Sequence, residues 1–294
     1  MIFDVISEPF PLTGTPGTEF FTRPLETVIS VPEMAGGKAF ELDVVLSIGR
    51  GQDNERRAGC VEQYALERSE VEHLLSRQVD GLIMASSQGP EEDGLFRKIE
   101  ARGTPYVLID RRFSETKAAY VGADNREIGR LATGHLIGQG CRRIGHIAGP
   151  QKNIGIGRLE GYRAALADHD MPYREELVVD GTGDEGYAAT RQLLALADRA
   201  DGIFCFNDPY AVNTLKAAFE AGLRVPEDVK VIGAGNVHYS DVLRVPLSTI
   251  DQQSAQTGEQ AAEILLGMIG PKKKKAPKIV RIKPELLVRE STRA

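Results

Sequence analysis

The alternation of short apolar runs with helical patterns is the feature that most constrains the fold of this chain. Runs of strand length recur along the sequence, and many are apolar at every position rather than at every second one. Uniformly apolar strands are typical of parallel sheets that are covered on both faces. Because helical patterns separate the runs, the sequence predicts βαβ units and an α/β fold with doubly wound, Rossmann-like parallel sheets.

The same pattern predicts the individual elements. We expect strands near residues 1–6, 42–48, 81–85, 106–109, 119–122, 143–148, 177–179, 202–206, 229–233, 247–250 and 278–282. We expect helices over residues 55–78, 91–102, 125–140, 157–168, 185–197, 209–221 and 254–269. Residues 9–18 are rich in Pro, Gly and Thr and are interpreted as a loop excursion. Pro24 and Pro32 predict a broken helix in residues 19–40.

The expected strands fall into two sets, with breaks near residues 111–117 and 249–253. We interpret them as two lobes joined by a hinge of several chain crossings. The first lobe is expected to contain residues 1–112 and 252–273, and the second residues 113–251 and 274–294. A small ligand would bind in the cleft between such lobes.

Charge and cysteine content exclude several classes of protein. The net charge of −6 argues against binding of nucleic acid by this chain alone, because duplex binding depends on Lys and Arg. No apolar run is long enough to span a bilayer, and the acidic N-terminus does not resemble a secretory signal. Cys60, Cys141 and Cys205 are widely spaced, which favours reduced, buried thiols in a cytoplasmic protein.

One candidate binding residue follows from local pattern. An apolar run over residues 144–148 ends at Gly149 and Pro150, and a glycine-rich loop then leads to a helix expected from Gly157. Arg158 would lie in the first turn of that helix, at the carboxyl end of a strand, where ligands bind in parallel sheets. Its guanidinium suits paired hydroxyls, a carboxylate or a phosphate. The alternative is a solvated arginine without a ligand.

Sequence signatures of catalysis are absent or weak. No phosphate-binding loop or nucleophile elbow occurs, and His73, His135, His146, His169 and His238 lack the spacing of metal ligands. We therefore expect no metal and no cofactor. Residues 181–186, GTGDEG, fit G-x-G-x-x-G, but nearby acidic side chains would repel a pyrophosphate, so we expect a capped turn. The lysines at 272–275 are interpreted as a solvated turn.

Several stretches, taken in order, resemble the effector-binding region of the lactose/galactose repressor family. The resemblance covers residue 42 to the C-terminus. It rests on VDGLI at 79–83, PYVLIDRR at 105–112, VGADNRE at 121–127, HIAGP at 146–150, RLEGY at 158–162, FND at 206–208, RVPED at 224–228, VIG at 231–233 and PELLVREST at 284–292.

The resemblance implies a periplasmic-binding-protein-like core that is not an enzyme. Such a core binds a small, sugar-like effector between its lobes and forms a homodimer. Lobe closure then sets the geometry of paired helix-turn-helix headpieces, through which alone operator DNA is bound. This headpiece would precede the first strand and is missing here. We expect a truncated form of a regulator rather than a natural relative without the headpiece.

The family's ligand positions map onto this sequence one at a time. Its arginine in R-x-x-G-[YF] corresponds to Arg158, its cleft asparagine to Asn207, an acidic position to Asp110 and a polar position to Gln252. The aromatic pair of the first helix corresponds to Phe20 and Phe21, displaced by the insertion at residues 9–18. The resemblance therefore implies aromatic faces for apolar sugar surface, and Arg, Asp and amide groups for hydroxyls.

One departure concerns the acid that the family often carries after the strand ending at Gly233. The sequence here reads Ala234, Gly235, Asn236, so we expect Asn236 to replace part of that carboxylate as an amide.

Two other functions remain as alternatives. One is a solute-binding protein of a sugar transporter, which the absence of a signal disfavours. The other is an α/β enzyme that uses residues 181–186 for a nucleotide.

Overall fold

A computed structural model describes residues 27–31, 40–46, 56–86, 94–113, 116, 118–150, 153–269 and 279–293, with the backbone alone for residues 27–31, 40–46 and 56–65. The expected strand at residues 1–6, the excursion at 9–18 and the lysines at 272–275 lie outside the described residues. No helix in the described part of the chain is long and apolar enough to cross a membrane.

The first lobe contains a six-stranded sheet in the order β1-β2-β3-β4-β5-β11. All neighbouring strands are parallel except β1 and β2. Its strands are β1 (Thr27–Val31), β2 (Phe40–Leu46), β3 (Leu82–Ala85), β4 (Tyr106–Ile109), β5 (Ala119–Ala123) and β11 (Ile279–Ile282). Its helices are α1 (Arg56–Ser76), α2 (Leu95–Arg102) and α7 (Ser254–Ile269).

The second lobe contains the other six-stranded sheet, in the order β12-β10-β9-β8-β6-β7. Only β12 is antiparallel to its neighbour. Its strands are β6 (Ile144–Ala148), β7 (Val178–Asp180), β8 (Gly202–Cys205), β9 (Lys230–Ala234), β10 (Ser248–Asp251) and β12 (Glu285–Leu287). Its helices are α3 (Asn125–Gly138), α4 (Asn153–Asp168), α5 (Tyr187–Leu194) and α6 (Asp208–Glu220), and short 3-10 turns span Glu175–Leu177 and Glu290–Thr292.

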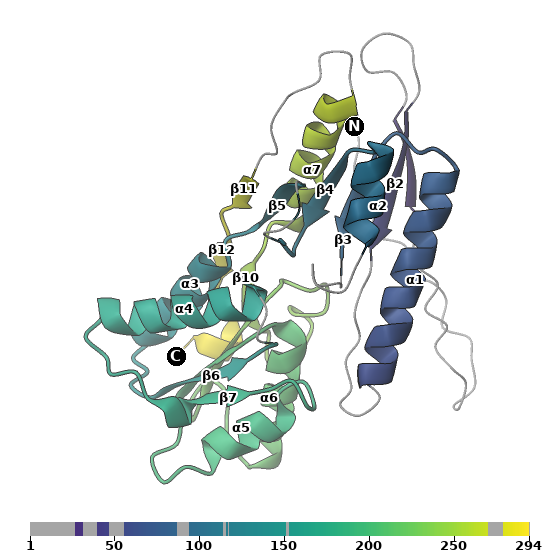
Figure 1. The fold of residues 1–294 in the computed structure, drawn as a ribbon. Coiled ribbons are helices and arrows are strands. Elements are labelled where there is room, and N and C mark those ends of the chain that lie inside the picture. The colour runs from purple at the N-terminus through teal and green to yellow at the C-terminus, as the bar shows by residue number, and fades with distance from the viewer. Residues whose placement is uncertain are drawn as a thin grey trace.

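Helices cover both faces of each sheet, as the uniformly apolar strands predict (Figure 1). In β3, Leu82 and Met84 pack with α1 and α2, whereas Ile83 faces α7. This alternation follows from the two-residue period of a strand. In the second lobe, Phe204 packs with α3 and α4, and its neighbour Ile203 packs with α5 and α6. The two lobes are therefore separate three-layer units with their own cores.

The chain crosses between the lobes at points that differ in part from the expected boundaries. We expected the first lobe to end at residue 112, but β5 pairs with β4, so the chain passes to the second sheet only after Ala123. The chain returns to the first lobe after Asp251, the end of β10. The last crossing was expected at residue 274, but β11 pairs with β5, and the chain leaves the first sheet only after Ile282. Strand pairing, rather than the loop composition that we used, decides these boundaries.

Three other expectations about elements were wrong. Residues 27–31 form β1, antiparallel to β2, where we expected a broken helix. Residues 285–287 form β12, which the sequence pattern did not indicate. Helix α4 begins at Asn153 rather than Gly157, so Arg158 lies well inside the helix. Gly155 and Gly157 are therefore helical, and Cβ atoms there would approach the carbonyl oxygen of Pro150 to 2.1 Å and Cβ of Asn125 to 2.9 Å.

Candidate functional site

Arg158 is the centre of the candidate site. Its side chain is only 2% exposed. The Nε–H donates to Oδ1 of Asn125 at 3.1 Å, Nη2 donates to Oε1 of Gln252 at 3.1 Å, and Nη1 donates to the carbonyl oxygen of Phe206. The guanidinium also lies over the Phe206 ring, with Cζ 4.8 Å from the centroid. Asn125 and Gln252 follow two different interlobe crossings, so Arg158 connects both of them.

Close contact between α3 and α4 positions Arg158 beside Asn125. A Cβ at Gly129 of α3 would lie 2.1 Å from the carbonyl oxygen of Arg158. A Cβ at Gly161 of α4 would lie 2.0 Å from the carbonyl oxygen of Arg126. Since real Cβ atoms do not approach so closely, only glycine allows the two backbones to touch here. The helix pair therefore behaves as one packed unit that carries Asn125 and Arg158 together.

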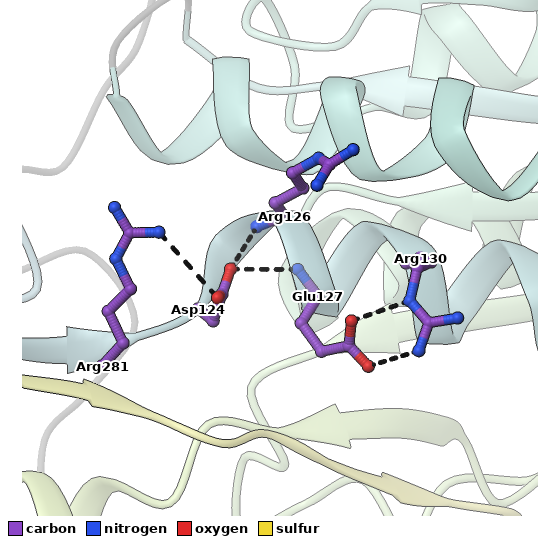
Figure 2. Close-up of polar contacts among 5 residues, drawn as sticks. All are labelled: Asp124, Arg126, Glu127, Arg130 and Arg281. Carbon is purple, nitrogen blue, oxygen red and sulfur yellow. Dashed lines mark hydrogen bonds and ion pairs between the residues drawn. The ribbon is translucent and has the colours of Figure 1, made fainter.

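Asp124 fixes the start of α3 at the first crossing. Its carboxylate accepts hydrogen bonds from the backbone N–H groups of Arg126 and Glu127, both at 3.1 Å (Figure 2). Only half of a capping box forms, because the Glu127 side chain pairs with Arg130 at 2.8 Å instead of turning back to the cap. The Asp124 N–H donates instead to the carbonyl oxygen of Ile282, which connects the first crossing to the third at 3.0 Å.

Arg158 remains a cation at neutral pH although it is buried. Burial lowers the pKa of its guanidinium to about 10, and the carboxylates of Asp110 and Asp208 oppose this shift. A guanidinium has one N–H on Nε and two on each Nη. One hydrogen on Nη1 and one on Nη2 thus have no partner among the described residues. The site offers a fixed positive charge with two spare donors.

The other polar groups near Arg158 also have unused capacity. Within the described part of the chain, the amide oxygen of Asn207 accepts from the Tyr210 N–H at 3.0 Å, which leaves its NH₂ group free. Gln252 uses its oxygen for Arg158, and its NH₂ group likewise has no described partner. Asp110, with φ of 61°, ends β4 and presents an exposed carboxylate without a hydrogen bond to any described residue. Donors from three residues and one acceptor suit a ligand with several hydroxyl groups.

Comparisons with known proteins identify the family of this chain. Residues 133–292 match the periplasmic binding protein-like domain family. The chain is 36% identical over 285 residues to the HTH-type transcriptional regulator CelR of Thermobifida fusca, covering 92% of this chain and 82% of that protein. The chain belongs to the lactose/galactose repressor family. Its two lobes form the effector-sensing core of such a transcriptional regulator.

Further relatives support the same family. The HTH-type transcriptional repressor PurR of Escherichia fergusonii is 36% identical over 232 residues, which cover 76% of this chain and 67% of that protein. A solved CelR–cellobiose complex matches with a TM-score of 0.70 and 33% identity, over 78% of this chain and 71% of that one. A LacI-family regulator from Enterococcus faecium with bound ribose has a TM-score of 0.68 and 29% identity, over 76% and 83% of the two chains.

Asn236 of this regulator bonds two residues that are not among the candidates. Its Nδ2 donates to Oδ2 of Asp251 at 2.8 Å, and its Oδ1 accepts from Nη2 of Arg289 at 2.8 Å. One amide hydrogen of Asn236 is thus bonded to strand β10, and its side-chain oxygen is bonded to the C-terminal segment. Asn236 connects the loop after β9 to the second crossing. Phe20 and Phe21 lie outside the described residues.

Asp208 is an important residue that sequence reasoning did not single out. Its buried carboxylate accepts from Thr249 Oγ1 at 2.6 Å, Ser240 Oγ at 3.1 Å and the Val237 N–H at 3.0 Å. It also lies so close to Gly233 that a Cβ there would meet Oδ1 at 2.2 Å. Buried charge requires such partners. The partners of its carboxylate come from the loop after β9 and from β10, which are distant in sequence, so the FND stretch alone did not reveal them.

Residues 181–186 form a capped turn, as expected from their acidic side chains. Oδ1 of Asp180 accepts from the Thr182 N–H at 2.9 Å, and Oδ2 of Asp184 accepts from the Ala188 N–H at 2.9 Å. A Cβ at Gly181 would lie 2.5 Å from the Ile147 side chain, so this glycine serves packing. These carboxylates accept hydrogen bonds from the backbone N–H groups that a pyrophosphate would need.

His146 makes the stability of the second lobe depend on pH. Its ring is buried between Tyr162 and Phe204, with centroids 5.4 and 4.6 Å away. Nδ1 bonds the carbonyl oxygen of Phe204 at 3.0 Å, and Nε2 has no partner within the described structure. Burial lowers the pKa of His146 to about 4, the Phe204 carbonyl opposes this shift and the Arg158 charge adds to it. The folded state therefore keeps a neutral imidazole.

We expect the free energy of unfolding to fall by about 2 kcal/mol between pH 7 and pH 5 through His146. Above pH 6.5 the ring is neutral in both states, whereas below it the unfolded chain binds a proton that the folded chain does not. Urea unfolding at the two pH values measures this change. His146→Phe should remove this decrease of about 2 kcal/mol, and His238→Phe, where the replaced ring is exposed, should retain it. Equal slopes in wild type and His146→Phe would contradict the assignment.

Proposed function

We propose that this regulator core binds a small polyhydroxylated effector, a sugar or sugar derivative, between its lobes at Arg158. The observation that carries the proposal is the buried, charged guanidinium, which has two N–H groups without a partner among the described residues. The NH₂ groups of Asn207 and Gln252 lie beside it and likewise have no described partner. Sugar hydroxyls accept from these donors and donate to the carboxylate of Asp110. The Phe206 ring beneath the guanidinium limits access of water to it.

The relatives support the class of ligand but leave its identity open. CelR was solved with cellobiose and the Enterococcus faecium regulator with ribose. Gly235 and Asn236 replace the acid that the resemblance implies after β9, and Asn236 is already bonded to Asp251 and Arg289. We infer that the effector of this chain forms fewer hydrogen bonds to carboxylates on that side of the site.

Effector binding would change DNA affinity through lobe closure. The effector groups come from both lobes, with Asp110 in the first and Arg158 in the second, so a ligand that contacts both favours one lobe arrangement. In the proposal this arrangement sets the separation of two DNA-binding headpieces in a homodimer. The core itself carries out no chemical reaction.

A thermal-shift screen tests this function. Mono- and disaccharides, nucleosides and nicotinamide nucleotides are each added to the chain at a saturating concentration. A matching sugar should stabilise the fold by about 2.7 kcal/mol when its concentration is a hundred times its Kd. Stabilisation by a nicotinamide nucleotide and by no sugar would overturn the proposal in favour of the nucleotide enzyme.

We also expect a homodimer that involves both lobes. Helix α1 exposes half of Leu66, and the second lobe exposes 78% of Val242 in the segment before β10. The double variant Leu66→Lys, Val242→Lys should raise the dimer dissociation constant at least tenfold, because each lysine would be desolvated in an apolar contact. Sedimentation equilibrium measures the constant, with Ala101→Lys on the exposed side of α2 as control. A monomeric wild type at high concentration would contradict this expectation.

A further inference from the structure

A second interlobe cavity lies beside the first crossing, with a volume of about 400 Å³. The first lobe contributes Arg112, Ile279 and Arg281 to its walls, and the second contributes Arg126 and others from the starts of α3 and α4. This volume is in the range of small-molecule sites. Arg158, Asn207, Asp110 and Gln252 are not among its lining residues, and Asn125 separates it from the guanidinium of Arg158.

Three guanidinium groups at this cavity are poorly neutralised. Among the described residues, the side chains of Arg112 and Arg126 have no hydrogen-bond or ionic partner, and the dashed lines in Figure 2 reach only the backbone nitrogen of Arg126. Arg281 meets Asp124 at 3.9 Å, which is the outer limit of an ion pair. Arginines with weak or no pairing are common on protein surfaces, but here three from separate segments line one cavity.

The two acids at the cavity, Asp124 and Glu160, offset only part of the charge of the three arginines. Asp124 is held by the backbone N–H groups of Arg126 and Glu127 at the start of α3, so its carboxylate faces the helix end. Glu160 is the other acid in the walls. Helix α4 also begins at the cavity, at Asn153, and a helix start carries a partial positive charge. The cavity is therefore electropositive.

Apolar side chains complete the walls. Ile156 is 43% exposed and Ile279 is 49% exposed, and both line the cavity from different lobes. Both side chains offer apolar contact area to a bound molecule beside the arginines. Together with the arginines, they suit a molecule that has an anionic group and a small organic body.

We propose that this cavity binds a small organic phosphate. Its phosphate dianion lies between the guanidinium groups of Arg112, Arg126 and Arg281, and its organic part contacts Ile156 and Ile279. A dianionic phosphate monoester matches three cations better than a carboxylate does, because it has more charge and more acceptor oxygens. Since both lobes form the walls, the ligand stabilises the lobe arrangement seen here. By linkage, it and the effector at Arg158 alter each other's affinity.

Calorimetric titration with phenyl phosphate at constant ionic strength tests the site. Wild type should bind it saturably and more tightly than inorganic phosphate, which lacks the apolar part. The double variant Arg126→Gln, Arg281→Gln should weaken binding at least tenfold. Arg174→Gln, which alters an arginine paired with Glu176 elsewhere on the second lobe, should leave the affinity unchanged. Melting temperatures confirm that each variant is folded.

The same titration separates this site from the effector site. Gln252→Ala should bind phenyl phosphate as wild type does, because Gln252 does not line this cavity, whereas it removes an NH₂ donor from the effector site. Weaker phenyl phosphate binding in Gln252→Ala would overturn the proposal, because the probe would then occupy the effector site. Equal affinity in wild type and the double variant, or heats that do not saturate, would also overturn it.

Discussion

Arg158→Ala should weaken effector binding at least a hundredfold. The substitution removes a buried cation with two spare N–H donors, and charge-assisted hydrogen bonds of this kind contribute about 1.5–3 kcal/mol each. It also frees the oxygens of Asn125 and Gln252, which would then turn toward new partners and disorder the site. Calorimetry with the sugar identified by thermal shift measures the loss.

Two further variants make this test specific. Arg163→Ala removes an exposed arginine from the same helix, where the guanidinium lies 4.6 Å over the Tyr173 ring, and should leave effector affinity unchanged. Arg158→Lys keeps the charge but loses the planar fork, so it should recover only part of the affinity. Unchanged affinity in Arg158→Ala, with a wild-type circular dichroism spectrum, would remove Arg158 from the site.

Gly161→Ala should destabilise the second lobe by about 2–3 kcal/mol, in the range of overpacked cores. The added methyl group would lie 2.0 Å from the carbonyl oxygen of Arg126, so α3 and α4 must separate. This separation moves Asn125 away from Arg158, and effector affinity should fall together with stability. Urea unfolding and calorimetry on the same preparation measure the two effects.

Gly134→Ala is the matched control for this prediction. Gly134 lies in α3, and a Cβ there would meet nothing within 4 Å. Alanine is the better helix former by up to about 1 kcal/mol, so this variant should be as stable as wild type or more so. If Gly161→Ala were equally well tolerated, the contact between the two helices would not constrain the site.

The architecture followed from the sequence because it depends on local pattern. Uniformly apolar strands such as 106–109 indicate covered parallel sheets, and α7 was expected over the residues that form it. The predictions of elements that failed depended on contacts distant in sequence. The start of α4 was misplaced because Gly155 and Gly157 read as loop residues, although close packing requires them inside a helix. The strand β1 was missed because only its pairing with β2 defines it.

The same difference between local pattern and contacts distant in sequence applies to the candidate site. Arg158 and Gln252 are 94 residues apart, and the resemblance to a family, not spacing, put them together; the structure connects them by a hydrogen bond. Asn236 was expected to serve as an amide ligand, and spacing gave no sign of its bonds to Asp251 of β10 and Arg289 of the C-terminal segment. The importance of Asp208 was equally hidden, since its partners come from the loop after β9 and from β10.

The hydrogen bonds of Arg158 have a consequence for the entropy of ligand recognition. An arginine side chain has about 2 kcal/mol of rotamer entropy, and a flexible arginine loses much of it when a ligand orders it. Here three hydrogen bonds and the Phe206 ring hold the guanidinium within the folded protein. The side chain of Arg158 therefore loses its rotamer entropy when the protein folds, not when the effector binds. Each contact with an effector then contributes nearly its full strength to affinity.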